Sequence, residues 1–184
     1  MIGRPLNGVV LRLTRFADTS LIVTWLSQEE GKIKTAARGA RRPSSPFAGK
    51  LDLFHWCELL VLPTKRSEIQ TLKETRVIED FAGIRRRYAN MLAAAYFAEC
   101  VDETIELEHP VPEIFDLLIR AYRYLNGSEI DASTVTFFEA ELGHLLGIGS
   151  ESRQLTADSL RSHLGRALKT HQELSDQIGR RHRR

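Results

Sequence analysis

The sequence predicts an α+β protein of two domains, an N-terminal five-stranded β-barrel followed by an all-α helical domain. Two observations favour this arrangement. Apolar residues recur with a period of two from about Leu6 to Phe81, and after Gly83 they recur at the three- and four-residue spacing of helices. The 184 residues, of which 42% are hydrophobic, are enough to bury a core in one domain or in two small ones. We therefore expect domains at residues 1–80 and 81–184.

Five segments in the first part have the pattern of strands. They are Val9 to Thr14, Leu21 to Leu26, Ile33 to Ala37, a long apolar run from Leu51 to Leu62, and Ile69 to Ile78. Gly31 follows the second segment, where a glycine supplies the positive φ that a hairpin turn needs. Five strands in about 75 residues are the content of a small closed barrel of the OB-fold kind.

The second part has the pattern of consecutive amphipathic helices. We expect a long first helix through Met91 that ends near His109, a second from Pro112 to Leu125, a third capped by Asp131 or Ser133, a short fourth capped by Thr156, and a last one from Leu168 to Ile178. No internal repeat or low-complexity segment interrupts them.

Charge is distributed in three blocks. The net charge of the chain is +2, but residues 1–87 carry +7, residues 88–150 carry −9 and residues 151–184 carry +4. Such asymmetry indicates a basic working surface in the first part, rather than the mixed surface of a typical enzyme.

The basic charge of the first part is concentrated between Gly31 and Lys50, where no acidic residue occurs. Six cations lie in this segment: Lys32, Lys34, Arg38, Arg41, Arg42 and Lys50. The two lysines are two residues apart on a strand and share one face, and the arginines follow at the strand end and in the next loop. A cationic surface of this kind binds phosphates with little sequence preference, because each neutralised phosphate releases counterions. The alternative is a solvated cationic surface without a ligand.

Aromatic residues bear on whether single strands are bound, because unpaired bases stack on exposed rings. The candidates are Phe16, Trp25, Phe47, Phe54 and Trp56. Trp25 and Trp56 lie inside apolar strands and are expected in the core. Phe47 follows Ser45 and Pro46 in a polar loop, so it is the preferred candidate for contact with DNA.

Two further clusters of cations lie outside the barrel pattern. Arg85, Arg86 and Arg87 precede the first long helix, where cations oppose the helix dipole, so a polyanion would stabilise them. A solvated junction between domains is the alternative. The chain ends in a basic tail, Arg180 to Arg184, which is expected to be disordered and to add unspecific affinity.

Three stretches of this sequence together resemble the RecO family of DNA repair and recombination mediator proteins. They are LRLTRFADTSLIVTWLSQEEGKIKTAARGARRPSS at residues 11–45, FFE at 137–139 with HLLGI at 144–148, and HLGRALKTHQEL at 163–174. The resemblance covers nearly the whole chain. It implies a DNA-binding protein that acts on single- and double-stranded DNA, promotes strand annealing and works with a RecR-type partner in loading a recombinase. Many family members carry a four-cysteine zinc motif, but residues 149–156 read GSESRQLT here, so we expect a variant without zinc.

The resemblance also implies a site for the acidic, apolar C-terminal tail of single-stranded DNA-binding protein in the helical domain. Such a tail needs a hydrophobic slot bordered by cations. The candidate residues are Arg120, Arg123 and Tyr124, with Arg166 and Lys169 as companions. The alternative for the arginines is pairing with Glu99, Asp102 or Glu103 on the same molecule.

Motifs of other functional classes are missing from the sequence. It has no nucleophile elbow, no phosphate-cradling glycine loop and no His/Asp/Glu cluster at metal-binding spacing, so we expect no catalytic residue and no cofactor. Its two cysteines, Cys57 and Cys100, indicate neither a disulfide nor zinc. Without a signal-type or membrane-spanning stretch, the chain is expected to be cytoplasmic and associated with the nucleoid. A non-catalytic protein-interaction adaptor with an OB-like barrel is the alternative function, and a nuclease is disfavoured.

Overall fold

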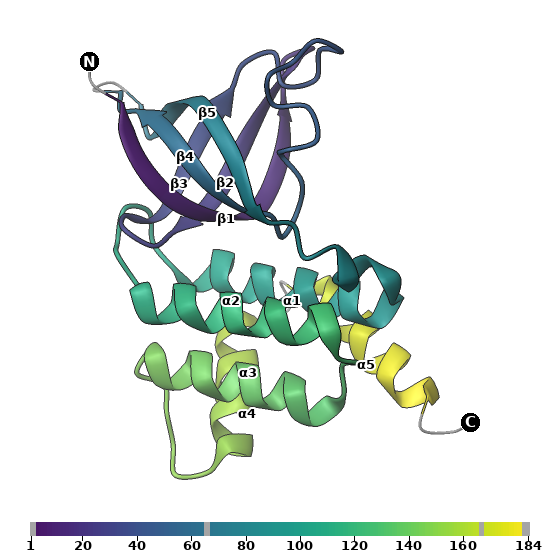
Figure 1. The fold of residues 1–184 in the computed structure, drawn as a ribbon. Helices are drawn as coiled ribbons and strands as arrows, with labels where there is room; N and C mark the ends of the chain where they lie inside the picture. Colours follow the sequence, from purple (N-terminus) through teal and green to yellow (C-terminus); the bar gives the residue numbers. More distant parts are fainter. Residues whose placement is uncertain (1–2, 65–66, 166–167, 182–184) are drawn as a thin grey trace. The chain divides into compact units, whose positions relative to one another are not determined.

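A closed five-stranded barrel forms the first part of the fold (Figure 1). The structure is a computed structural model that describes residues 3–64, 67–165 and 168–181. The strands are β1 (Arg4–Phe16), β2 (Ser20–Ser27), β3 (Gly31–Ala37), β4 (Trp56–Leu62) and β5 (Ile69–Glu79). They follow the order β1-β2-β3-β5-β4, and only β3 and β5 pair in parallel. The barrel confirms the predicted OB-type fold.

The alternation of the sequence positions the barrel core. On β3, Ile33, Thr35 and Ala37 are buried, whereas Lys32 and Lys34 point to the other face and are half-buried. The indole N–H of Trp25 donates to Oγ1 of Thr35 at 2.8 Å, so the ring's polar atom is satisfied inside the core. The buried residues of this core are Leu6, Val10, Val23, Trp25, Ile33, Ala37, Phe47, Cys57, Leu59, Val61 and Leu72.

Helices form the second part of the fold. They are the 3₁₀ helix η1 (Ala82–Arg86), α1 (Tyr88–Thr104), α2 (Pro112–Gly127), α3 (Ala132–Leu145), α4 (Arg153–Leu164) and α5 (Lys169–Arg181). Aromatic rings pack against one another in their core: Phe97 stacks on Phe138 with ring centroids 3.9 Å apart, and Phe81 packs edge-on against Tyr122. No helix among the described residues is long and apolar enough to span a membrane.

The chain divides into two compact units, and each unit is made of two separate stretches of the sequence. The barrel unit contains the residues up to Asp80 together with Ile105–Phe115, and the helical unit contains Phe81–Thr104 and the residues from Asp116. The expectation that the first helix continues to His109 is wrong, because α1 ends at Thr104.

The segment after α1 lies along the edge of β3. The backbone N–H of Glu108 donates to the carbonyl of Lys32 at 2.9 Å, and Leu107 forms a bridge with the same lysine. Gly31 has a φ of +71°, as predicted, and a Cβ there would lie 1.8 Å from the carbonyl oxygen of His109. Only glycine therefore allows the two segments to approach this closely.

Two further element boundaries differ from the prediction. β4 begins at Trp56, because the residues before it close one end of the barrel: Leu51 and Leu53 pack on its core, and Phe54 has a φ of +73°. α4 begins at Arg153, so Thr156 lies inside its first turn, where its Oγ1 accepts from the N–H of Ser150. The third helix is capped as predicted by Asp131, whose carboxylate accepts from the N–H of Thr134 at 2.7 Å.

Candidate nucleic-acid interface

The outer face of the first three strands carries two rows of side chains that strand pairing brings together. Arg12 pairs with Thr24, and Thr24 pairs with Lys34. Nearer the strand ends, Phe16 pairs with Ser20. Residues that pair directly point to the same face of a sheet. Arg12 and Lys34 therefore flank Thr24, although they are 22 residues apart in the sequence.

The basic loop, which we define as residues 38–55, is built from consecutive turns. The N–H of Arg42 donates to the carbonyl of Gly39 at 3.0 Å, and the N–H of Ser45 donates to the carbonyl of Arg42 at the same distance. The guanidinium of Arg41 donates to the carbonyl of Asp18 at 3.0 Å, and its N–H donates to the carbonyl of Thr19 at 2.9 Å. The loop is thus attached to the turn between β1 and β2.

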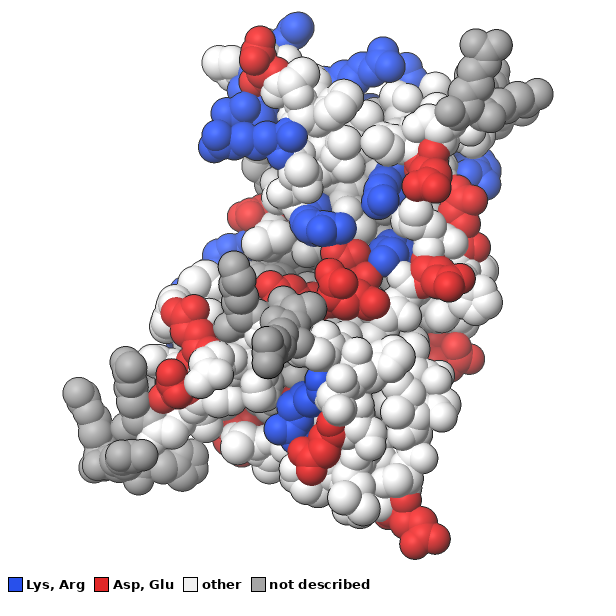
Figure 2. Space-filling model, turned by 180° about the vertical axis from the view of Figure 1, so that it is seen from behind, with Lys and Arg blue, Asp and Glu red and all other residues white. Residues whose placement is uncertain are grey.

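The three arginines of the basic loop are exposed to solvent. Within the described part of the chain, Arg38, Arg41 and Arg42 form no ion pair with a carboxylate. Figure 2 shows Lys and Arg side chains gathered over the barrel on the face turned away in Figure 1. Arg41 uses one guanidinium N–H on the carbonyl of Asp18, so its remaining donors and the guanidinium groups of Arg38 and Arg42 can bind an external anion.

Phe47 does not occupy the position expected for a base-stacking residue. Its side chain is 6% exposed and belongs to the barrel core. The expectation that it projects from the polar loop is therefore wrong. The physical reason is that the loop crosses one end of the barrel, where an apolar ring gains more by burial than by exposure to water.

The remaining predicted cations are more dispersed. Lys32 lies at the other end of β3 from Arg38, beside the segment that contains Glu108, and about 20 Å of strand separates the two positions. Lys50 is half-buried within the loop, and its carbonyl contacts the ring of His55 at 3.1 Å. Arg85 and Arg86 are exposed in the last turn of η1, which belongs to the helical unit.

Sequence reasoning did not include two arginines and undervalued one aromatic residue at this interface. Arg12 and Arg15 on β1 are exposed, and Phe16 beside them is 52% exposed. The signal was present, because Arg12, Thr14 and Phe16 are spaced by two and therefore share a strand face. Because these residues lie far from the basic loop in the sequence, the sequence alone did not indicate that they belong to the same surface.

The helical unit contains a pocket of about 400 Å³. Its lining combines aromatic rings with cations: Phe97, Leu117, Arg120, Ala121, Tyr124, Ser133, Thr134, Phe137, Phe138 and Arg153. The guanidinium of Arg153 lies 5.1 Å from the ring centre of Phe137. The structure thus brings the predicted residues Arg120 and Tyr124 to one apolar pocket and adds Arg153, which the sequence reasoning missed.

The other residues predicted for a partner site are not part of this lining. Arg123 is exposed on α2 but does not line the pocket. Arg166 lies outside the described residues, as does the side chain of Lys169, and the same holds for most of the tail from Arg180 to Arg184. Within the described part of the chain, Arg120 has no ion pair with Glu99, Asp102 or Glu103.

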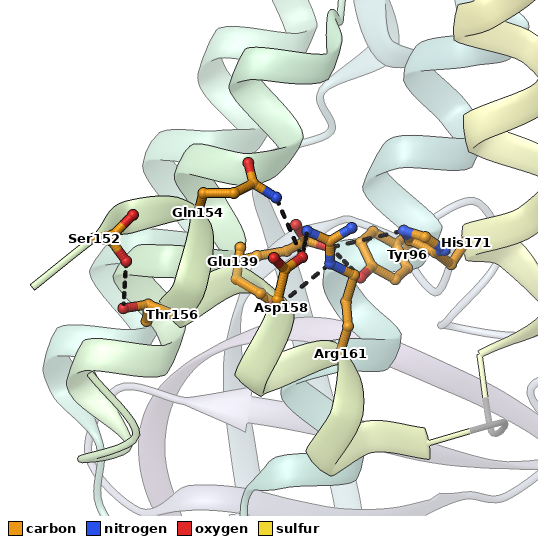
Figure 3. A network of polar contacts seen from close by, with 9 residues as sticks. Tyr96, Glu139, Ser152, Gln154, Thr156, Asp158, Arg161 and His171 are labelled. Atoms are coloured by element: carbon orange, nitrogen blue, oxygen red, sulfur yellow. Dashed lines mark hydrogen bonds and ion pairs between the residues drawn. The ribbon is translucent and has the colours of Figure 1, made fainter. Parts of the chain in front are cut away.

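A buried polar network lies beside this region, between α1, α3, α4 and α5 (Figure 3). Glu139 is 1% exposed, accepts from the hydroxyl of Tyr96 at 2.6 Å and lies 3.5 Å from Nε of Arg161. Burial raises the pKa of the Glu139 carboxyl above its ordinary value, although Tyr96 and Arg161 act in the opposite direction. Nε2 of His171 lies 3.9 Å from the same carboxylate, and burial lowers the pKa of this histidine. The network holds the helices together in the interior.

Metal ligands are not clustered in the part of the chain that the structure describes. No group of three or more His, Cys, Asp or Glu side chains there is arranged to hold an ion. Cys57 and Cys100 are both buried and free, and burial raises the pKa of the Cys57 thiol to about 11.

Comparison with known proteins assigns both units to one family. The Recombination protein O N-terminal domain matches residues 4–81, and the Recombination protein O C-terminal domain matches residues 85–154. The first match covers the barrel strands, and the second runs from the end of η1 to the start of α4.

Curated relatives give the same result. The chain is 32% identical over 149 residues to the DNA repair protein RecO of Rhodopirellula baltica, a match that covers 81% of this chain and 55% of the relative. It is 33% identical over 143 residues to the DNA repair protein RecO of Salinibacter ruber, covering 77% and 55%. It is 35% identical over 131 residues to the DNA repair protein RecO of Bacillus subtilis, covering 71% and 50%. The chain thus spans about half the length of the relatives it matches, and these matches together with the two matching domains place it in the RecO family.

Proposed function

We propose that this protein is a DNA-binding mediator of recombinational DNA repair that acts without catalysing a reaction itself. The observation that carries the proposal is the group of exposed arginines in the basic loop, Arg38, Arg41 and Arg42, which form no ion pair among the described residues. Membership of the RecO family supports the same function.

The mechanism follows from the repulsion between phosphates. Two DNA strands approach each other poorly because both backbones are negatively charged. A cationic surface that binds both strands lowers this repulsion and releases counterions, so complementary bases meet more often. Single- and double-stranded DNA both offer the required phosphates. Strand annealing, and recombinase loading together with a RecR-type partner, are the functions we assign to this surface.

The pocket of the helical unit is the proposed site for the C-terminal tail of single-stranded DNA-binding protein. A peptide that ends in an apolar ring and a free carboxylate needs an apolar cavity with a cation at its border. Phe97, Phe137 and Phe138 supply the apolar wall, and Arg120 and Arg153 supply the cations. This arrangement supports the proposal that the protein engages DNA and its coating protein together.

DNA binding is tested by fluorescence anisotropy with a labelled oligonucleotide between about 50 and about 200 mM salt. Wild-type affinity is expected to fall steeply as salt increases. Replacing Arg38, Arg41 and Arg42 together by alanine removes three phosphate contacts, which lowers the magnitude of the log–log salt slope for a single strand by about 2.

A matched control removes the same charge elsewhere on the barrel. Arg4, Lys73 and Arg76 lie on β1 and β5 away from the basic loop, and Arg4 and Arg76 already pair with glutamates. Their replacement by alanine is expected to leave the salt slope close to that of the wild type. Binding that is undetectable or insensitive to salt would instead favour an interaction adaptor.

A further inference from the structure

The barrel unit exposes one large aromatic ring beside its basic loop. Phe16, at the end of β1, is 52% exposed, whereas Trp25, Phe47, Phe54 and Phe115 are buried and Trp56 is half-buried. The ring of Phe16 has no aromatic or cation–π partner within the described part of the chain. Single exposed apolar side chains are common on protein surfaces, so the position of this ring beside the basic loop, and not its exposure alone, carries the inference.

Strand pairing aligns Phe16 with the arginines of the basic loop. Phe16 pairs with Ser20 on β2, and Leu21, the next residue, pairs with Ala37 on β3. The chain continues from Ala37 into Arg38, so Arg38 lies near Ser20 at the end of the same face. Two strand spacings, about 10 Å, separate the backbone of Phe16 from that of Arg38.

Three hydrogen bonds hold this arrangement in place. The N–H of Gly39 donates to Oγ of Ser20 at 3.3 Å, and Arg41 donates to the carbonyls of Thr19 and Asp18 at 2.9 and 3.0 Å. The turn that follows Phe16 contains Ala17 with a φ of +53°, a conformation that residues other than glycine rarely adopt. The basic loop therefore fixes the turn, and the ring is held at the border of the cationic surface.

We propose that Phe16 is a stacking platform for an unpaired base, and that it directs this surface toward single-stranded nucleic acid. The inference rests on the proposed DNA-binding function and adds the class of strand. Arginine side chains are long enough to contact the phosphates on either side of a base that stacks on Phe16. In a duplex the bases are already stacked and paired, so the ring finds no free face there. The turn that follows Phe16 contains one acidic residue, Asp18, which is exposed. The backbone carbonyl of Asp18 accepts a hydrogen bond from the guanidinium of Arg41.

The test compares Phe16→Ala with Phe16→Trp on three labelled probes: a thymine oligonucleotide, an abasic oligonucleotide of the same length and a duplex. Loss of one base-stacking contact is expected to weaken binding of the thymine strand by roughly 5- to 150-fold. Affinity for the abasic strand and for the duplex is expected to stay within about twofold, because both retain their phosphates but offer no free base. Phe16→Trp is expected to restore binding to the thymine strand.

The matched control is Ile78→Ala on β5, which removes the other large apolar side chain that is exposed among the described residues of the barrel unit. It is expected to change none of the three affinities. Equal affinities of Phe16→Ala and wild type for the thymine strand would overturn the stacking role while leaving DNA binding intact. An equal loss on the abasic strand would overturn it as well, because the ring would then act through the backbone or the fold. If the wild type binds none of the three probes, the proposed function fails too.

Discussion

The backbone N–H of Gly39 donates a hydrogen bond to the side-chain oxygen of Ser20, and this contact joins the start of β2, directly after the turn from β1, to the basic loop. Because the loop carries the arginines and the turn follows Phe16, this serine, together with the two hydrogen bonds of Arg41, connects the two components of the proposed interface. The contact spans 19 residues of sequence and is partly buried.

Replacing Ser20 by alanine leaves the amide of Gly39 without its acceptor. The free energy of unfolding is expected to fall by about 1 kcal/mol, as for a typical lost hydrogen bond. DNA affinity is expected to fall less than in the triple arginine variant, because Arg41 still binds the carbonyls of Asp18 and Thr19. Urea denaturation and anisotropy measure the two effects. Ser20→Thr keeps the hydroxyl and serves as the control, and a Ser20→Ala variant as stable as the wild type would contradict the prediction.

Phe47 is expected to act on stability and not on DNA. Its ring fills one end of the barrel core, so Phe47→Ala is expected to lower the free energy of unfolding by about 3–5 kcal/mol. Phe47→Leu keeps most of the buried apolar volume, and its affinity for single-stranded DNA is expected to stay within about twofold of the wild type. Denaturant unfolding and anisotropy on the same samples check both values. A well-folded Phe47→Leu variant that binds single strands weakly would show that the ring contacts DNA after all.

Peptide binding to the pocket of the helical unit is expected to depend on the arginines that line it and not on an arginine that lies outside it. Arg120→Ala and Arg153→Ala each remove a cation from the lining, so each is expected to weaken binding of an acidic peptide that ends in phenylalanine by about tenfold or more. Arg123→Ala removes the same charge from α2 outside the pocket and is expected to bind the peptide like the wild type. Titration calorimetry provides the affinities. A larger loss for Arg123→Ala than for Arg120→Ala would place the peptide elsewhere.

Glu139 is expected to make stability depend on pH. The pKa of its carboxyl is raised in the folded state above the ordinary value of 4.5. Its contribution to the free energy of unfolding is therefore fully present below about pH 4.5 and is lost as pH rises through the folded pKa. The slope of the unfolding free energy from this one group is at most about 1.4 kcal/mol per pH unit. Glu139→Gln keeps an acceptor for Tyr96 but does not titrate, so this part of the slope is expected to disappear.

His171 contributes with the opposite sign in a neighbouring pH range. Its pKa is lowered in the folded state below the ordinary value of 6.5. Its contribution to the free energy of unfolding is therefore present above about pH 6.5 and is lost as pH falls through the folded pKa. Urea denaturation of Glu139→Gln, with and without His171→Asn, separates the two groups. An unchanged pH profile in Glu139→Gln would mean that this carboxyl titrates normally.

Much of the fold could be predicted because its signals are local. Alternation of apolar residues identified five strands, Gly31 marked the turn before β3, and Asp131 marked the start of α3. Each of these depends on neighbours within a few residues, where backbone geometry and side-chain chemistry act directly. The outward direction of Lys34 follows in the same way from its place between buried Ile33 and Thr35.

The errors concern segments whose conformation depends on distant residues. Leu51 to His55 resembles a strand, but it closes one end of the barrel, where Leu51 and Leu53 meet a core made by other strands. The segment after Thr104 resembles the continuation of a helix, but the edge of β3 offers it backbone hydrogen bonds at Lys32. Neither contact is visible from local periodicity.

The amino-acid sequence by itself determined that this protein has a barrel, a set of helices and a run of cations on one strand and its following loop. Only the tertiary structure decided that Phe47 is core and that Phe16 accompanies the arginines. The physical reason is that side-chain direction along a strand depends on the next residue or two. The choice of which exposed groups become neighbours depends on strand register and barrel closure, which join residues more than 20 positions apart.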